Sequence, residues 1–178
     1  MPDNRKKGNT MATQAELVKV IQTEAERMHQ YLAALPEDAW TKPSACALWE
    51  VRDVVVHLIG NAHAYTGHIT RAVRDDTSPP PGGFDPTIFK THSPEERRQW
   101  VMALAQRPLA NRGRFGNDLV SAFSHAWDPF PRFLAALSTQ DWHKPCFHSF
   151  GIIPVHSLVH GAVSELAIES IRSFLRFP

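Results

Sequence analysis

Apolar residues recur at helical spacing along most of the chain, and this pattern predicts four main helices. The first is expected from Thr13 to just before Pro36, with Thr13 and Glu16 spaced as a capping box. The second is expected from about Glu50 to Arg74. One face of this second helix is apolar and contains Val51, Val54, Val55, Leu58, Ala62, Tyr65 and Ile69.

The pattern is less regular in the second half of the chain. Residues 93–96 give a strong helix start, but Pro108 interrupts the apolar pattern, which resumes at Leu119. Pro129 and Pro131 then predict a kink or break. The fourth helix is expected from near Pro154 to about Phe174. Loops are expected over 36–49, 75–92 and 138–153.

Since no segment alternates as a strand does, the predicted fold is all-α, a four-helix bundle with a long connection between helices 2 and 3. Residues 1–12 are expected to be a flexible leader and 13–178 a single domain. Residues 33–43 match residues 135–145 at six of eleven positions, including a Trp-x-Lys-Pro sequence. Either the two loops meet the same local need, or the bundle consists of two similar helical hairpins.

Composition narrows the class of partner. The chain has 178 residues, 43% of them hydrophobic, and 19 Lys and Arg against 18 Asp and Glu, a net charge of +1. This balance argues against nucleic-acid binding by bulk charge. No stretch is long and apolar enough to span a membrane, and the N-terminus lacks a signal core, so a cytoplasmic protein is expected. Two cysteines are too few for a disulfide framework.

Among the ten histidines, His57 is the main candidate for chemistry. At about 100° per residue, His57, Asn61, Ala64 and His68 form one row beside the apolar face of the second helix. Apolar neighbours shield an imidazole from water and keep it neutral, which is the state that binds a metal. The alternative is a histidine at the edge of the core whose ring nitrogens hydrogen-bond within the protein.

The predicted fourth helix carries Glu165 and Glu169, four residues apart, and Arg172 three residues further on. The two carboxylates would share a face and could bind a divalent ion, or Glu169 and Arg172 could pair in a narrow solvated stripe. His156 and His160 are a competing pair with the same spacing. They point about 140–180° away from Glu165, so the two pairs would not easily serve one ion.

Two stretches carry a family resemblance. Residues 35–43, followed by 46–58 with Trp49, Arg52, Asp53 and His57, resemble the DinB/YfiT-like superfamily, and more narrowly the N-terminal domain of mycothiol-dependent maleylpyruvate isomerases. Residues 142–151 and 165–169 resemble the fourth helix of the same family. The resemblance covers most of residues 14–175 in the order of the elements.

The resemblance implies a bundle that holds one divalent metal ion, with His57, Glu165 and Glu169 as ligands. The family usually has histidine at the position of Glu169, so this set departs from its pattern. One imidazole and two carboxylates favour harder metals than a histidine-rich site does, and zinc, nickel and manganese are the candidates. Asn61 and Arg172 are weaker candidates for orienting a substrate.

The main functional hypothesis is a metal-dependent enzyme of the thiol-transfer or isomerisation type, or a hydrolase built on the same site. It would act on a small molecule and could use a low-molecular-weight thiol. The alternative is a non-catalytic helical module, either a ligand-binding bundle or a dimerising stress-response protein with a degenerate metal site. A homodimer is possible under either hypothesis, whereas neither a nucleic acid nor a membrane is expected as a partner.

Overall fold

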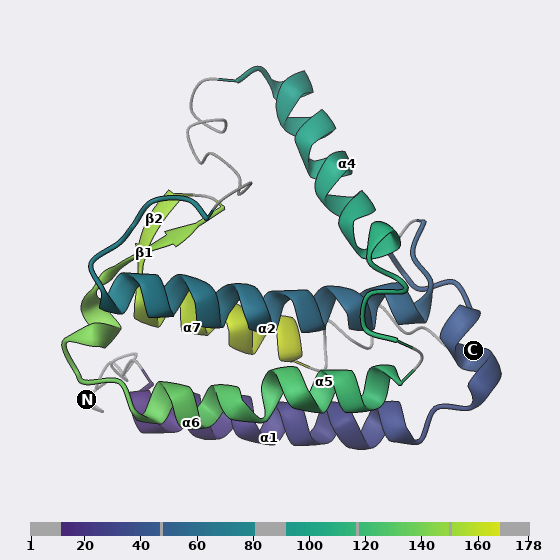
Figure 1. The fold of residues 1–178 in the computed structure, drawn as a ribbon, viewed down its shortest axis with the longest axis horizontal. Coiled ribbons are helices and arrows are strands. Elements are labelled where there is room, and N and C mark those ends of the chain that lie inside the picture. Colours follow the sequence, from purple (N-terminus) through teal and green to yellow (C-terminus); the bar gives the residue numbers. More distant parts are fainter. Residues whose placement is uncertain (1–11, 47, 81–91, 117, 150, 168–178) are drawn as a thin grey trace, which may run out of the picture.

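The computed structural model describes residues 12–46, 48–80, 92–116, 118–149 and 151–167. The expected leader therefore lies almost entirely outside the described residues. The described part is mostly helical, as predicted (Figure 1). In chain order, the elements are α1 (Gln14–Ala33), η1 (Glu37–Thr41), α2 (Val51–Val73), α4 (Pro94–Ala110), α5 (Leu119–Trp127), α6 (Pro129–Ala135), η2 (Asp141–His143), β1 (Pro145–His148), β2 (Gly151–Pro154) and α7 (Val155–Leu166).

The bundle is formed by α1, α2, α7 and the pair α5–α6 (Figure 1). Helices α5 and α6 lie end to end in Figure 1 and together take the place of the fourth helix. Pro129, Pro131 and the helical backbone of Asp128 mark the break between α5 and α6, where the sequence predicted a kink. Both predicted capping boxes are present, Thr13 with Glu16 and Ser93 with Glu96. These caps fix where α1 and α4 begin.

Large aromatic side chains fill the centre of the bundle. Phe123, Trp127, Phe130 and Trp142 are almost completely buried. The indole N–H of Trp127 donates a hydrogen bond to the backbone carbonyl of Leu58, at 3.1 Å, so its polar group is satisfied within the core. Since Leu58 follows His57 directly, this contact ties the segment of α2 that carries the candidate histidine to α5.

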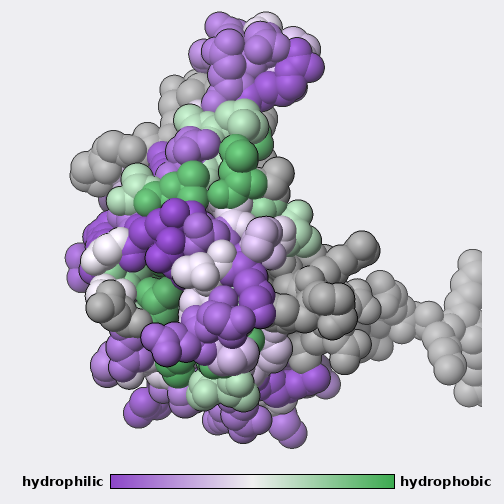
Figure 2. All heavy atoms as spheres, turned by 90° about the vertical axis from the view of Figure 1, so that its right-hand side faces the viewer, coloured by the Kyte–Doolittle hydropathy of each residue, from purple (hydrophilic) through white to green (hydrophobic). Residues whose placement is uncertain are grey.

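Helix α4 stands off the bundle (Figure 1). Its only buried residue is Pro108, and Val101 and Met102 are exposed. The sequence predicts an interruption at Pro108, and α4 ends two residues later, at Ala110. Pro108 lies in the last turn, so its missing N–H costs a single helical hydrogen bond. Figure 2 shows the protruding part, with a hydrophilic tip above hydrophobic side chains.

The expected loop over 138–153 contains a short helix, η2, and a hairpin. Strands β1 and β2 pair antiparallel, from Pro145 opposite Pro154 to His148 opposite Gly151. Gly151 has a φ of +134°, a conformation that side chains disfavour, and it allows the tight turn. The pattern did not reveal these strands because each has only four residues and their burial does not alternate cleanly.

The two matching sequence segments have matching backbone structure. Each forms a short 3-10 helix, and each then returns to the start of the next bundle helix. The N–H of Val51 donates to the carbonyl of Lys42, and the N–H of Val155 donates to that of Lys144, both at 3.0 Å. Val51 and Val155 are the first residues of α2 and α7, so these two helices begin in the same way.

Candidate functional site

A cavity of about 520 Å³ lies beside α2, between the base of α4, the hairpin and α7. The row that the sequence predicted on α2, consisting of His57, Asn61, Ala64 and His68, lines its wall. The hairpin adds Phe147 and His148, α4 adds Trp100, Leu104 and Arg107, and α7 adds Glu165. Tyr65 and Arg71, also on α2, add further polar groups to the lining.

His57 and Glu165 meet at this wall. Nε2 of His57 lies 3.5 Å from Oε2 of Glu165, and their side chains are 35% and 37% exposed, so solutes can reach both. The ring of Trp49 packs against the His57 ring at a centroid distance of 5.3 Å. The Trp49 indole N–H also donates to the carbonyl of Ala105 in α4, at 2.7 Å. Trp49 thus links the position of His57 to the base of α4.

Asn61 lies one turn after His57, and its amide Nδ2 is 3.0 Å from Nε2 of His57. The imidazole nitrogen that faces the cavity therefore has two polar neighbours, an amide from its own helix and a carboxylate from α7. The contact with Asn61 also fits the alternative of a histidine at the edge of the core that hydrogen-bonds within the protein. His57 is a half-exposed group at the cavity wall, and its Nε2 faces both polar neighbours.

The expected partners Glu169 and Arg172 lie outside the described residues. Helix α7 ends at Leu166, not near Phe174, and Ala167 is in an extended conformation. The prediction that Glu165 and Glu169 share one helix face falls on residues outside the described part of the chain and stays a prediction. Over the described ranges, no group of three or more His, Cys, Asp and Glu side chains is placed to hold a metal ion.

The donors present are compatible with part of a metal site. Two ligand atoms that each lie about 2.1 Å from one ion are about 3.0 to 3.4 Å apart for bond angles between octahedral and tetrahedral. The 3.5 Å between Nε2 of His57 and Oε2 of Glu165 is close to that range. A neutral imidazole and a carboxylate are also ligand types that zinc, nickel and manganese accept. The pair thus fits two of the ligands of a divalent ion.

Two further histidines shape the electrostatics of the cavity: His68, from the predicted row on α2, and His148, which the sequence did not single out. Burial, together with the charges of His148 and Arg71, lowers the pKa of His68 to about 4. Burial also lowers the pKa of His148, although Glu165 opposes this shift. On the same side, burial and the charge of Glu165 raise the pKa of Tyr65. This half of the cavity therefore keeps His68 and Tyr65 uncharged at neutral pH.

The positive charges of the cavity come from two arginines. Arg71 lies near the end of α2 and pairs with Asp76 at 2.8 Å. Arg107 lies in the last turn of α4, and its side chain is exposed. Arg107 could not be predicted from the sequence, because it reaches the cavity only through the way α4 packs against α2.

Neither cysteine of the chain is suited to be a thiolate. Cys46 is half-buried, and burial together with the charge of Glu165 raises the pKa of its thiol. Cys146 is buried in the core, and burial raises its pKa to about 11. Both thiols are therefore almost fully protonated at neutral pH, which makes them weak nucleophiles.

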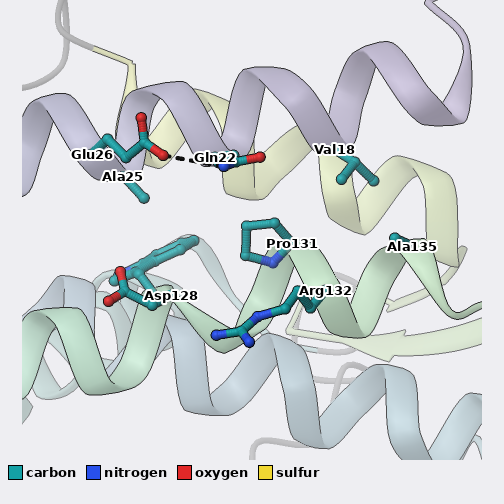
Figure 3. Close-up of a pocket in the computed structure, with 9 residues that line it drawn as sticks. Val18, Gln22, Ala25, Glu26, Asp128, Pro131, Arg132 and Ala135 are labelled. Atoms are coloured by element: carbon teal, nitrogen blue, oxygen red, sulfur yellow. Dashed lines mark hydrogen bonds between the residues drawn. The ribbon is translucent and has the colours of Figure 1, made fainter.

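A second cavity, of about 400 Å³, lies between α1 and the α5–α6 pair (Figure 3). Gln22, Glu26, Asp128 and Arg132 provide its polar lining, and Gln22 donates a hydrogen bond to Glu26 at 3.1 Å. Its described lining contains neither histidine nor cysteine. It therefore lacks the imidazole groups that make the first cavity a candidate for chemistry.

The competing pair His156 and His160 lies elsewhere. Nδ1 of His156 is 3.3 Å from the backbone carbonyl of Trp142, and its ring packs against that of His143. His160 is exposed. Neither residue lines the cavity that contains His57 and Glu165.

The bundle, with a histidine and a glutamate meeting beside its second helix, has the fold of the DinB/YfiT-like superfamily. Within that class, the chain belongs to the family of mycothiol maleylpyruvate isomerase N-terminal domains, whose model matches residues 21–150. No curated protein matches the sequence.

Two solved structures resemble the chain. One is the crystal structure of the mycothiol-dependent maleylpyruvate isomerase, with a TM-score of 0.62 and 15% identity. The other is a variant of that enzyme in which one histidine is replaced by alanine, with a TM-score of 0.62 and 14% identity. Each match covers 90% of this chain and 60% of the solved chain. At such identity the likeness shows the fold, and this chain spans about three-fifths of the isomerase.

No described helix is both long enough and apolar enough to cross a membrane.

Proposed function

We propose that this chain carries the active site of a metal-dependent enzyme that uses an external thiol to isomerise or transfer a group on a small molecule. The observation that carries the proposal is the meeting of His57 and Glu165, from two different helices, at the wall of one cavity. Membership of the isomerase family supports the type of chemistry. That the substrate is a small molecule is also proposed here, because this chain spans only 60% of the solved isomerase.

His57 and Glu165 would hold a divalent ion, and Glu169 remains the proposed further ligand from the sequence. Such an ion lowers the pKa of a thiol or water that reaches it, which supplies an anion at neutral pH. Trp49 fixes the ring of His57, and the carbonyl of Ala105 fixes Trp49 in turn. The orientation of the imidazole is therefore set before any ligand arrives, which favours binding.

The thiol would come from solution. With the pKa of Cys46 raised and that of Cys146 at about 11, neither side chain supplies a thiolate at neutral pH. A low-molecular-weight thiol is therefore the proposed cosubstrate. Mycothiol is the first to test, because the solved relative is named for its dependence on it.

The rest of the cavity would bind the small molecule. Arg71 and Arg107 provide positive charge for an anionic group, and Trp100, Leu104 and Phe147 provide apolar surface that excludes water. His68 is held neutral, so one of its ring nitrogens can accept a hydrogen bond from a bound group. The prediction that Arg172 orients the substrate stays a prediction.

The test begins with the metal content of protein purified without a histidine tag. We expect about one zinc, nickel or manganese ion per chain in the wild type, and a loss of about tenfold or more in affinity for His57→Ala and for Glu165→Gln. His160→Ala and Glu26→Gln are the matched controls, since both residues are exposed and lie outside this cavity. They should bind metal like the wild type.

Activity is then followed with maleylpyruvate and mycothiol, by the absorbance of the substrate. Thiol-dependent turnover that is lost in His57→Ala would support the proposal. A protein without stoichiometric metal, with His57→Ala unchanged in stability, would contradict it and favour the non-catalytic module. Bound metal without turnover of any thiol and substrate pair would restrict the site to binding.

A further inference from the structure

The side chain of Asn61 lies beside His57, one of the two proposed metal ligands. Its amide is 3.0 Å from Nε2 of His57, which in turn is 3.5 Å from Oε2 of Glu165. All three side chains line one cavity and all three are half-buried. Nε2 of His57 is therefore close to one polar group from its own helix and to another from α7.

The internal repeat relates Asn61 to Glu165. The two bundle helices begin with the same hydrogen bond, from Val51 to Lys42 in α2 and from Val155 to Lys144 in α7. Asn61 follows Val51 by ten residues, and Glu165 follows Val155 by ten residues. The packing has the same symmetry, since α1 packs on α7 as α5 packs on α2. Asn61 and Glu165 thus occupy equivalent positions in the two halves of the bundle.

The amide has the chemistry of a ligand in one of its two orientations. Nδ2 faces His57 here, and a half-turn about the last side-chain bond exchanges it for Oδ1, which is an acceptor. Amide oxygens bind divalent ions, most readily the harder ones. The separation of 3.0 Å from Nε2 of His57 equals the distance of about 3.0 Å expected between two ligands at a right angle around one ion.

From these observations we infer that Asn61 is a metal ligand through Oδ1, and that it forms with His57 and Glu165 a donor set from two helices. The inference rests on the proposed function, because it concerns the same ion. It replaces the substrate-orienting role suggested by the sequence. In the described part of the chain, where no three His, Cys, Asp or Glu side chains are placed to hold an ion, Asn61 supplies the third donor.

The test measures how tightly the full-length, metal-free protein binds Co²⁺ and Zn²⁺, by competition with a chromophoric chelator. The Co²⁺ absorption spectrum reports the ligand set independently of activity. Asn61→Ala should weaken binding about tenfold or more and change the Co²⁺ spectrum. Asn61→Asp keeps the shape and adds a negative charge, so it should tighten binding. Gln22→Ala removes an exposed amide in the groove of Figure 3 and should change neither property.

The signs of these effects separate the possible roles. If Asn61 only donates a hydrogen bond to His57, it competes with the metal for Nε2, and Asn61→Ala would bind as tightly as the wild type or more tightly. That result overturns the inference while leaving the metal site and the proposed function in place. Weaker binding by Asn61→Asp also overturns it. A wild-type protein that binds neither ion overturns both. Circular dichroism of each variant confirms that the helices are intact.

Discussion

Among the described residues, Asp53 has the one fully buried charged side chain, and Arg112 pairs with it. Replacing Arg112 should therefore destabilise the fold. Asp53 lies in the first turn of α2 with no exposed surface, and its carboxylate receives two hydrogen bonds from Arg112, each at 2.6 Å. It also accepts from the backbone N–H of Glu50 at 2.8 Å. Arg112 belongs to the turn after α4, so the pair joins α4 to α2 four residues before His57.

The size of the effect follows from which partner is removed. Arg112→Met leaves a buried carboxylate without its cation, a change that typically costs 3–5 kcal/mol. Because 34% of the Arg112 side chain is exposed, we expect a value at the lower end, about 3 kcal/mol. Asp53→Asn leaves the positive charge on Arg112, whose side chain is partly exposed to water and also pairs with Glu50. This substitution should therefore cost less, about 1.5 kcal/mol. For a chain of this length, 1 kcal/mol corresponds to about 2–4 °C in Tm.

The effect should also depend on pH. Burial raises the pKa of Asp53, but the hydrogen bonds from Arg112 and Glu50 and the charges of Arg112 and Arg52 together hold it below its ordinary value of 3.8. In the wild type this carboxylate therefore stabilises the fold above the unfolded pKa, and that contribution is lost as pH falls through the lower, folded pKa. Without Arg112, burial dominates and the folded pKa rises. The stability deficit of Arg112→Met should then shrink between pH 7 and pH 4.5.

Urea unfolding followed by circular dichroism at the two pH values measures all of these quantities. Asp53→Asn provides the control, since its deficit has no carboxylate to titrate and should change little with pH. An Arg112→Met variant as stable as the wild type at pH 7 would refute the reasoning. So would an Asp53→Asn variant that is the less stable of the two, because the cost would then not come from an uncompensated buried charge.

Two further predictions concern the surroundings of the site. Trp49→Phe keeps an aromatic ring beside His57 but removes the hydrogen bond to Ala105, so it should weaken the attachment of α4 by about 1 kcal/mol. Amide hydrogen exchange over residues 100–107 should then be faster in Trp49→Phe but not in the control Trp40→Phe. Unchanged exchange in Trp49→Phe would count against the prediction. A Cys46→Ser, Cys146→Ala double variant should retain any thiol-dependent turnover, and a folded double variant without turnover would mean that the chain supplies its own thiol.

Much of the fold could be predicted because its signals are local. Apolar spacing, the capping box at Thr13 and the prolines at 129 and 131 each depend on neighbours within one or two turns. The hairpin and the stance of α4 could not be predicted in this way. Each strand has four residues, and α4 is held by contacts from distant segments, namely those of Trp49 with Ala105 and of Arg112 with Asp53.

For the candidate site, the helical row on α2 was enough to bring His57, Asn61 and His68 to one wall. The meeting of His57 with Glu165 was predicted through the family resemblance, since nothing local relates residues so far apart in the chain. Arg107 and His148 were missed, because α4 and the hairpin that carry them were not placed correctly. The site is thus predictable where one helix forms it and not where separate elements converge.

The position of α4 outside the packed bundle affects which substitutions the protein can tolerate. The helix supplies Trp100, Leu104 and Arg107 to the cavity, while the only residue it buries is Pro108. Substitutions along most of its length would therefore alter what the cavity recognises without disturbing the packed interior that holds His57 and Glu165. The specificity of the cavity could therefore be changed by substitutions on α4 with little effect on folding. A library randomised at Trp100, Leu104 and Arg107 would test this.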